Sequence, residues 1–193
     1  LIFKKAIQSQ DVALVALAAE IIQDTSMDFI DEYDNTYFLT QALHNCQLPR
    51  DIEAYFELAE AIEYINGATI SVEDQIEYQS IDWDVVTTIS PEQKALIKTT
   101  KGDITIKLNV NEAPIAVANF VKLVKEKYYD GSIFHRVVPN FVIQDGCTRG
   151  DGWGSENFTI RSEFSPSYFE EGSVGMASAG KDTESVQWFI TQY

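Results

Sequence analysis

The N-terminal segment, residues 1–66, carries apolar side chains at helical spacing. Three stripes recur every three or four residues, and their members are Val12, Val15, Ala16, Ala19 and Ile22, then Phe38, Leu39, Ala42, Leu43 and Cys46, then Ile52, Tyr55, Phe56, Ala59 and Ile62. Because an apolar stripe must be buried against another element, the pattern predicts packed helical hairpins. Asp11 and Asp51 stand at N-cap positions, where a carboxylate would face the free amides of the first turn.

Part of this segment superposes on itself when the sequence is shifted. The shift that places Asp11-Val12 on Asp51-Ile52 also places Ala19-Glu20 on Ala59-Glu60, and Ile22 on Ile62. The period and the paired helices resemble HEAT repeats, which run at about 40 to 47 residues. A generic helical hairpin whose capping aspartates coincide by chance is the alternative. Since fewer than about three repeats seldom bury enough surface, the repeat interpretation predicts further repeats before Leu1 in a longer parent.

The period changes in the second half of the chain. Residues 67–91 lose the helical pattern, which predicts a linker that packs partly through Trp83. Two β-rich runs, 95–100 and 104–108, then flank a turn that contains Gly102, so a hairpin is expected. A helix is predicted from Pro114, with strands at 132–138 and 142–144 and a glycine-rich loop over 145–153. The apolar stripe of this helix consists of Val117, Phe120, Val121 and Val124.

Composition and charge support two parts of different character. The content of hydrophobic residues is 45% over 193 residues, enough for at least one sizeable core. Of the net charge of −16, residues 1–90 carry −14, from 3 Lys and Arg against 17 Asp and Glu. An acidic surface repels phosphate backbones and anionic membranes, so nucleic acid is not an expected partner. No apolar run approaches the roughly 18 to 20 residues of a membrane span, and the first residues are not a signal peptide.

The two cysteines form no recognisable motif. Cys46 and Cys147 stand far apart in different halves of the chain, which fits neither a metal site nor the cysteine-dense framework of a small oxidised domain. We expect two small buried thiols.

Three motifs in the second half carry the chemistry. They read FHRVVPNFVIQDG over residues 134–146, GMASAG over 175–180 and VQWFIT over 186–191. Together they resemble the active face of cyclophilin-type peptidyl-prolyl cis/trans isomerases. The resemblance implies a multidomain α and β protein with HEAT-like hairpins over 1–66, a linker over 67–91, and a cyclophilin-like β-barrel over 92–193 that is incomplete at its C-terminus.

The resemblance also implies a role for individual residues. Arg136 matches the family's catalytic arginine, whose guanidinium presents several donors in a fixed fork. The positions that match substrate-binding residues are Phe141, Val142, Gln144, Ala177, Ser178, Ala179, Gln187 and Phe189. Val142 stands where methionine is common in the family, Ser178 where asparagine is common, and Asp145-Gly146-Cys147 where Gly-Gly-Asp is common. No cofactor and no metal are implied.

The resemblance covers roughly the first two thirds of a cyclophilin domain, from about Leu96 to Tyr193. We therefore expect that the sequence is shorter than its native parent and that this chain by itself has low or no isomerase activity. The expected partners are proline-containing peptides or unfolded protein clients, with a further protein partner on the helical repeats. The alternative function is a proline-peptide-binding or chaperone-like module without turnover. The sequence leaves the compartment undecided between cytoplasm and periplasm.

His135 and the loop over residues 150–154 raise two further hypotheses, both of which the sequence disfavours. His135 has no acidic partner at a recognisable spacing and no nucleophile-elbow motif near it, which argues against a catalytic triad with Ser132 or Cys147. The loop lacks the Gly-Lys-Ser/Thr ending of a phosphate-binding loop. We expect it to border the peptide groove instead.

Overall fold

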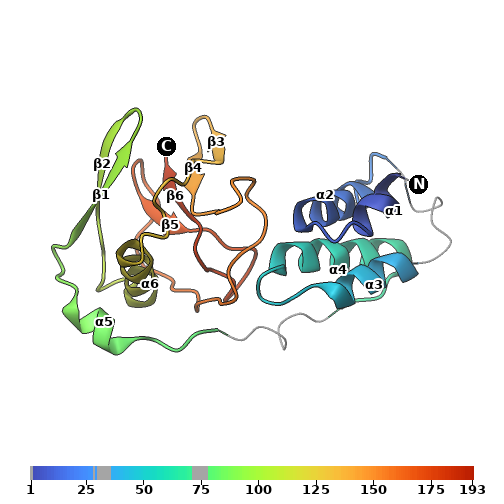
Figure 1. Ribbon diagram of the computed structural model, residues 1–193, viewed down its shortest axis with the longest axis horizontal. Helices are drawn as coiled ribbons and strands as arrows, with labels where there is room; N and C mark the ends of the chain where they lie inside the picture. The colour runs from blue at the N-terminus through green and yellow to red at the C-terminus, as the bar shows by residue number, and fades with distance from the viewer. Residues whose placement is uncertain (1, 28, 30–35, 71–77) are drawn as a thin grey trace. The chain divides into compact units, whose positions relative to one another are not determined.

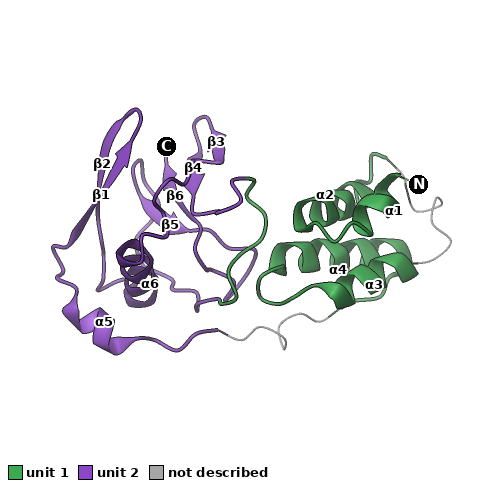
Figure 2. Cartoon of the chain, viewed as in Figure 1, with its two compact units in different colours: residues 1–77, 151–158 green, residues 78–150, 159–193 purple. Residues whose placement is uncertain are grey.

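The structure is a computed structural model that describes residues 2–27, 29, 36–70 and 78–193. Its contacts divide the chain into two compact units (Figure 2). The first unit contains residues 1–77 and 151–158, and the second contains residues 78–150 and 159–193. The assignment of domains to 1–66, 67–91 and 92–193 stays a prediction.

Four helices build the first unit: α1 Ile2–Ile7, α2 Val12–Ile22, α3 Tyr37–Asn45 and α4 Ile52–Asn66 (Figure 1). The predicted stripes face one another, and their buried members include Val15, Ala19 and Ile22 of α2 with Tyr55 and Ile62 of α4. Leu58, which the predicted stripe omitted, is fully buried at the centre of α4. The helices α2 and α4 begin at the two positions that the proposed repeat superposes, and the assignment to HEAT repeats stays a prediction.

The two predicted caps differ. Asp11 accepts hydrogen bonds from the amides of Ala13 and Leu14, both at 3.1 Å, so the cap on α2 is confirmed. Asp51 occupies the N-cap position of α4 but makes no side-chain bond to the first turn, so that part of the prediction is wrong. Its carboxylate is held by the Arg50 guanidinium at 2.8 Å and 2.9 Å and by the amide of Gln47 at 2.9 Å, which leaves it turned away from α4.

The segment Asp151–Phe158 belongs to the helical unit. Trp153 packs against the helical core, the amide of Ser155 donates to the Arg50 carbonyl at 2.8 Å, and the amide of Gly154 donates to the Glu53 carboxyl at 3.2 Å. The large apolar ring of Trp153 is thus partly covered by helical side chains. That the loop over residues 150–154 borders a peptide groove stays a prediction.

The carboxyl group of Glu53 is largely buried, which disfavours its charged form. Burial raises its pKa to about 7, against the weaker lowering effect of the hydrogen bond from Gly154, and the nearby carboxylates of Asp51 and Asp151 raise it further. The raised pKa means that the docked segment binds a proton that the undocked segment releases at neutral pH. The contribution of Glu53 is fully present below its ordinary pKa of about 4.5 and is lost as the pH rises through 7.

We predict that the segment around Gly154 loosens as the pH rises from 5.5 to 8. Hydrogen exchange measured by NMR and corrected for the intrinsic exchange rate will show at least about threefold less protection of the Gly154 amide at pH 8. Glu53→Gln keeps the acceptor oxygen and removes the ionisation, so its protection will not depend on pH. A pH dependence in the Gln variant equal to that of the wild type would contradict the assignment to Glu53.

The described part of the predicted linker contains a short helix. Helix α5 spans Trp83–Thr88, and its Asp82 cap accepts a hydrogen bond from the amide of Val85 at 3.0 Å. Trp83 is 58% exposed, so the prediction that this region packs through Trp83 is wrong. Val85, Val86 and Ile89 contact the core in its place. Part of the predicted linker, residues 71–77, lies outside the described residues.

The predicted hairpin and helix follow. Strands β1 Lys94–Thr99 and β2 Gly102–Lys107 pair antiparallel, and helix α6 spans Pro114–Lys125 with the proline in its first turn, so both predictions are confirmed. The α6 amides of Ile115 and Ala116 are capped by the distant carboxylate of Glu163, at 2.9 Å and 2.8 Å. Val124 is exposed, and Leu123 takes its place in the buried stripe of α6.

Four further strands form one antiparallel sheet. They are β3 Arg136–Val138, β4 Val142–Asp145, β5 Val174–Met176 and β6 Trp188–Thr191, in the spatial order β3-β4-β6-β5 (Figure 1). The strand predicted over 132–138 is thus shorter, because residues 132–135 pair with no strand. Within the described residues the strands form a two-stranded and a four-stranded sheet and no closed barrel, whereas the prediction was a β-barrel incomplete at its C-terminus.

The pleat of this sheet separates a core face from an opposite face. Trp188 and Ile190 are buried among α6 and β2 side chains, with Phe120 edge-on to Trp188 at 6.1 Å between ring centroids. Successive residues of a strand point to opposite faces. Phe189, which stands between Trp188 and Ile190, therefore points away from this core.

The two cysteines, Cys46 and Cys147, are free thiols. Cys147 is buried as predicted, whereas Cys46 is only half-buried, and burial raises the pKa of its thiol to about 11. No helix within the described ranges is long and apolar enough to cross a membrane.

Candidate active site

Three of the predicted site residues form one row across the sheet. Arg136 of β3 pairs with Gln144 of β4, which pairs with Phe189 of β6. Paired residues of antiparallel strands share a face, so all three side chains project from the face opposite the core. Residues from three separate strands are thereby brought within reach of a single short ligand.

A tight turn between β3 and β4 brings Phe141, a predicted substrate-binding residue, back to Arg136. The Phe141 amide donates to the Val138 carbonyl at 3.1 Å, and Asn140 takes a left-handed conformation with φ at 58°, which asparagine tolerates better than most residues. The turn places the Phe141 ring beneath the guanidinium of Arg136, with 5.6 Å from the guanidinium carbon to the ring centroid. Both side chains are exposed, Phe141 by 54%. A cation and an apolar ring are therefore presented together.

Two glutamines are joined at the middle of the row. The side-chain amide of Gln144 donates to the side-chain oxygen of Gln187 at 2.8 Å, and Gln187 is only 6% exposed. Two hydrogen bonds hold the residues just before Gln187. The side-chain amide of Asn119 in α6 donates to the Ser185 carbonyl at 2.6 Å, and the hydroxyl of Tyr129, which follows α6, donates to the Val186 carbonyl at 3.0 Å. Burial raises the pKa of Tyr129, so it remains a donor. Gln187 thus orients the Gln144 carboxamide beside Arg136.

Phe189 has an aromatic neighbour that the sequence did not reveal. The ring of Phe169 lies 5.4 Å from that of Phe189, and both cover Gly175, the partner of Phe189 on β5. A Cβ atom at Gly175 would lie 2.7 Å from the Phe189 ring and 2.8 Å from the Phe169 ring, so a larger residue would displace these rings from their present positions. The sequence signal for this neighbour is the cluster of aromatic residues at Phe164, Tyr168 and Phe169, all three of which are exposed.

The remaining predicted residues are placed less directly. Val142 points to the same face of the sheet as Gln144, but its side chain is only 3% exposed. A ligand on the exposed row of Arg136, Gln144 and Phe189 would therefore touch little of it. Ala177 donates its amide to the Gln187 carbonyl at 2.9 Å, and Ala179 donates its amide to the Thr183 hydroxyl at 2.9 Å. Peptide pairing along 177–179 would therefore rely on carbonyl groups or on the exposed Ser178.

The geometry does not support nucleophilic catalysis. The Ser132 hydroxyl donates its hydrogen bond to the Asp145 carboxylate at 2.9 Å, so Ser132 is paired with an acid and not with a histidine base. What the row offers is a positioned cationic donor, a carboxamide and apolar rings. Such a face can bind and polarise a ligand without forming a covalent bond to it.

The fold and site define a class: an α and β protein whose antiparallel sheet carries an arginine, a glutamine and phenylalanines on its outer face. The model of the family described as cyclophilin type peptidyl-prolyl cis-trans isomerase/CLD matches residues 94–193, just over half of the chain. The chain belongs to this family.

Named relatives agree with this membership. The chain is 47% identical over 98 residues to a peptidyl-prolyl cis-trans isomerase of Helicobacter pylori strain J99, covering 50% of this chain and only 60% of that relative's own length. It is 42% identical over 97 residues to one of Synechococcus elongatus, covering 50% and 67%. The crystal structure of a cyclophilin type peptidyl-prolyl cis-trans isomerase of Cryptosporidium parvum superposes with a TM-score of 0.50 at 34% identity, covering 52% and 67%.

Proposed function

We propose that this protein catalyses the cis/trans isomerisation of Xaa-Pro peptide bonds, with Arg136 as the catalytic residue. The observation that carries the proposal is the cross-strand row of Arg136, Gln144 and Phe189 on the face opposite the core. The names of the relatives, all peptidyl-prolyl cis-trans isomerases, support the same activity.

The reaction makes and breaks no bond, so the residues need only favour its twisted state. Amide resonance imposes a barrier of about 18 to 20 kcal/mol on rotation about the bond. In the twisted state the prolyl nitrogen regains a lone pair, which can accept a hydrogen bond from the Arg136 guanidinium. Because this bond is stronger in the twisted state than in either planar one, it lowers the barrier.

The neighbours of Arg136 supply substrate binding. The ring of Phe141 holds the guanidinium in place, and the Gln144 carboxamide can both donate to and accept from a substrate main chain. The Phe189 and Phe169 rings offer an apolar surface on which the pyrrolidine ring can be desolvated. The substrates are accordingly proline-containing peptides or unfolded proteins, and assistance of protein folding follows from that class.

Exchange spectroscopy on a capped Ala-Pro-containing peptide tests this function, and it decides between it and the expectation from the sequence that this chain by itself has low or no activity. Uncatalysed exchange takes tens to hundreds of seconds, so catalytic amounts of the protein should raise the exchange rate severalfold or more. A protein that broadens or shifts the peptide resonances without accelerating exchange would be a binding module without turnover. That result would refute the proposed catalysis and leave recognition of proline peptides in place.

A further inference from the structure

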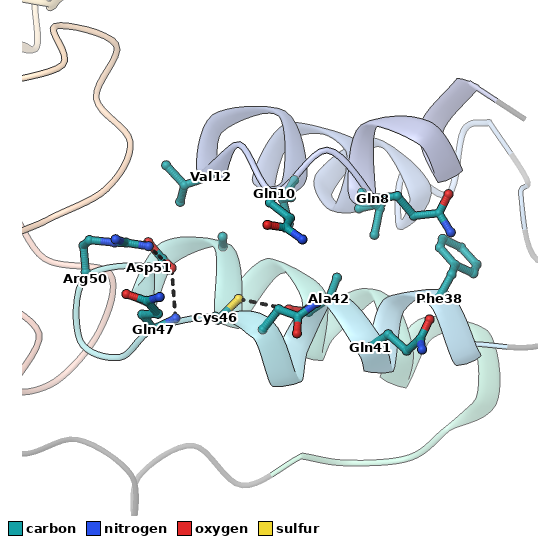
Figure 3. A pocket seen from close by; sticks show the side chains of 14 residues that line it. Gln8, Gln10, Val12, Phe38, Gln41, Ala42, Cys46, Gln47, Arg50 and Asp51 are labelled. Atoms are coloured by element: carbon teal, nitrogen blue, oxygen red, sulfur yellow. Dashed lines mark hydrogen bonds and ion pairs between the residues drawn. The ribbon is translucent and has the colours of Figure 1, made fainter.

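The helical unit contains a pocket that the isomerase activity does not use. Its volume is about 250 Å³, and it lies between α1 and the start of α2 on one side and α3 and the start of α4 on the other (Figure 3). Its lining includes the buried apolar side chains of Val15 and Phe38. The rim is rich in carboxamides: Gln8, Gln10, Gln41, Asn45 and Gln47.

Three of these carboxamides are open to a ligand, whereas the Gln41 side-chain amide donates to the Tyr37 hydroxyl at 2.9 Å and keeps its oxygen as an acceptor. Within the described part of the chain, the side chains of Gln8, Gln10 and Asn45 make no hydrogen bond to another residue. All three are exposed. The two charged residues that line the pocket, Arg50 and Asp51, form an ion pair with each other at 2.8 Å (Figure 3). A charged ligand therefore finds no unpaired charge on this lining, while a ligand with many neutral donors and acceptors finds complementary groups.

Gln10 sits in a conformation that its residue type disfavours. Its φ is 63°, in the left-handed region that glycine or asparagine adopts at lower cost. The residue forms the turn between α1 and α2, and its carboxamide lies between the two pairs of helices in Figure 3. Local strain of this kind concentrates at ligand-binding sites. Glycine would adopt this backbone conformation at lower cost. We therefore infer that the side-chain carboxamide of Gln10 is what the strained position provides.

We propose that this amide-lined pocket binds an extended, uncharged stretch of peptide main chain. A peptide group carries one donor and one acceptor, and each carboxamide supplies both, so successive peptide groups can pair with successive rim residues. The pocket is smaller than the roughly 300 to 1,000 Å³ of small-molecule sites. It suits a short part of a polymer whose remaining residues stay in solvent. The site is distinct from the Arg136 row and does not depend on isomerase activity.

The test uses a capped eight-residue peptide of alternating serine and threonine, which is neutral and favours extended backbone. Titrated into the isotope-labelled full chain, it should shift the side-chain amide signals of Gln10, Gln41 and Asn45 saturably. The same peptide with every second amide N-methylated lacks half of its donors and should bind about threefold to tenfold more weakly. Equal binding by the two peptides would overturn the proposal.

Variants separate the pocket from the rest of the helical surface. Gln10→Gly should melt no lower than the wild type, because strain is relieved, yet bind the peptide about threefold to tenfold more weakly. Gln41→Leu, within α3, should give the same loss. Gln23→Ala is the matched control, since Gln23 donates to Glu57 at 2.7 Å and does not line the pocket. Unchanged affinity in both pocket variants, or a neutral oligosaccharide that displaces the peptide, would disprove main-chain recognition.

Discussion

Arg136→Ala will reduce the acceleration of Xaa-Pro exchange by about 100-fold or more. The size follows from the loss of a donor that acts on the twisted state, for which single oxyanion-type donors are worth about 100-fold to 1,000-fold in rate. The fold will survive, because Arg136 is exposed on β3 at the edge of the sheet and its ring contact with Phe141 is worth only about 0.5 to 1 kcal/mol at an exposed site. Exchange spectroscopy measures the rate, and thermal unfolding checks the fold.

Arg136→Lys is the informative control for this prediction. Lysine keeps the positive charge and the ring contact but replaces the planar fork with a single flexible ammonium group. If the directed donor is what matters, the lysine variant will lose at least about tenfold in rate while peptide affinity changes little. An alanine variant with wild-type exchange rates would remove Arg136 from the mechanism, and a lysine variant with full activity would show that charge alone suffices.

Elements that depend on neighbouring residues in the chain were predicted well from the sequence. The stripe Val15, Ala19 and Ile22 specifies a buried helix face, and the runs around Gly102 specify a hairpin, because each depends on neighbours within a few residues. The candidate site residues Arg136, Gln144 and Phe189 were predicted from their motifs, and their role in catalysis stays a prediction. Their common row across three strands is a property of register, which neither motif contains alone.

Long-range contacts account for what the sequence did not predict. Asp51 looked like a side-chain cap, but the adjacent Arg50 and the amide of Gln47 compete successfully for its carboxylate. Nothing in the sequence of the loop over residues 150–154 pointed to the helical unit, yet its Trp153 packs against the helical core. Phe169 was not predicted as a candidate site residue. It lies beside the row because its ring contacts Phe189, which belongs to a later segment of the chain. No local pattern encodes such choices, because each depends on which distant surface is available.

The second large effect is expected at Gly146, between the strand that carries Gln144 and the following loop. Gly146→Ala will destabilise the second unit by about 3 kcal/mol, from roughly 1 to 2 kcal/mol for a left-handed conformation and roughly 1 to 3 kcal/mol for overpacking. Its φ is 98°, and an added Cβ would lie 2.3 Å from the Val186 carbonyl oxygen and 2.7 Å from the Gln187 Cα atom. Both are backbone atoms, so no side chain can move aside to relieve the clash.

The same clash will damage the active site, because the backbone that must retreat carries Gln187. The hydrogen bond from Gln144 to Gln187 will lengthen or break, and Gln144 will lose its orientation beside Arg136. Gly131→Ala is the matched control: its φ of 83° is equally unfavourable, but a Cβ there meets nothing within 4 Å, so it should cost only about 1 kcal/mol. Denaturant unfolding and the side-chain amide signal of Gln144 measure the two effects. Equal, small losses in both variants would show that the contact of Gly146 with the backbone of Val186 and Gln187 does not hold the site together.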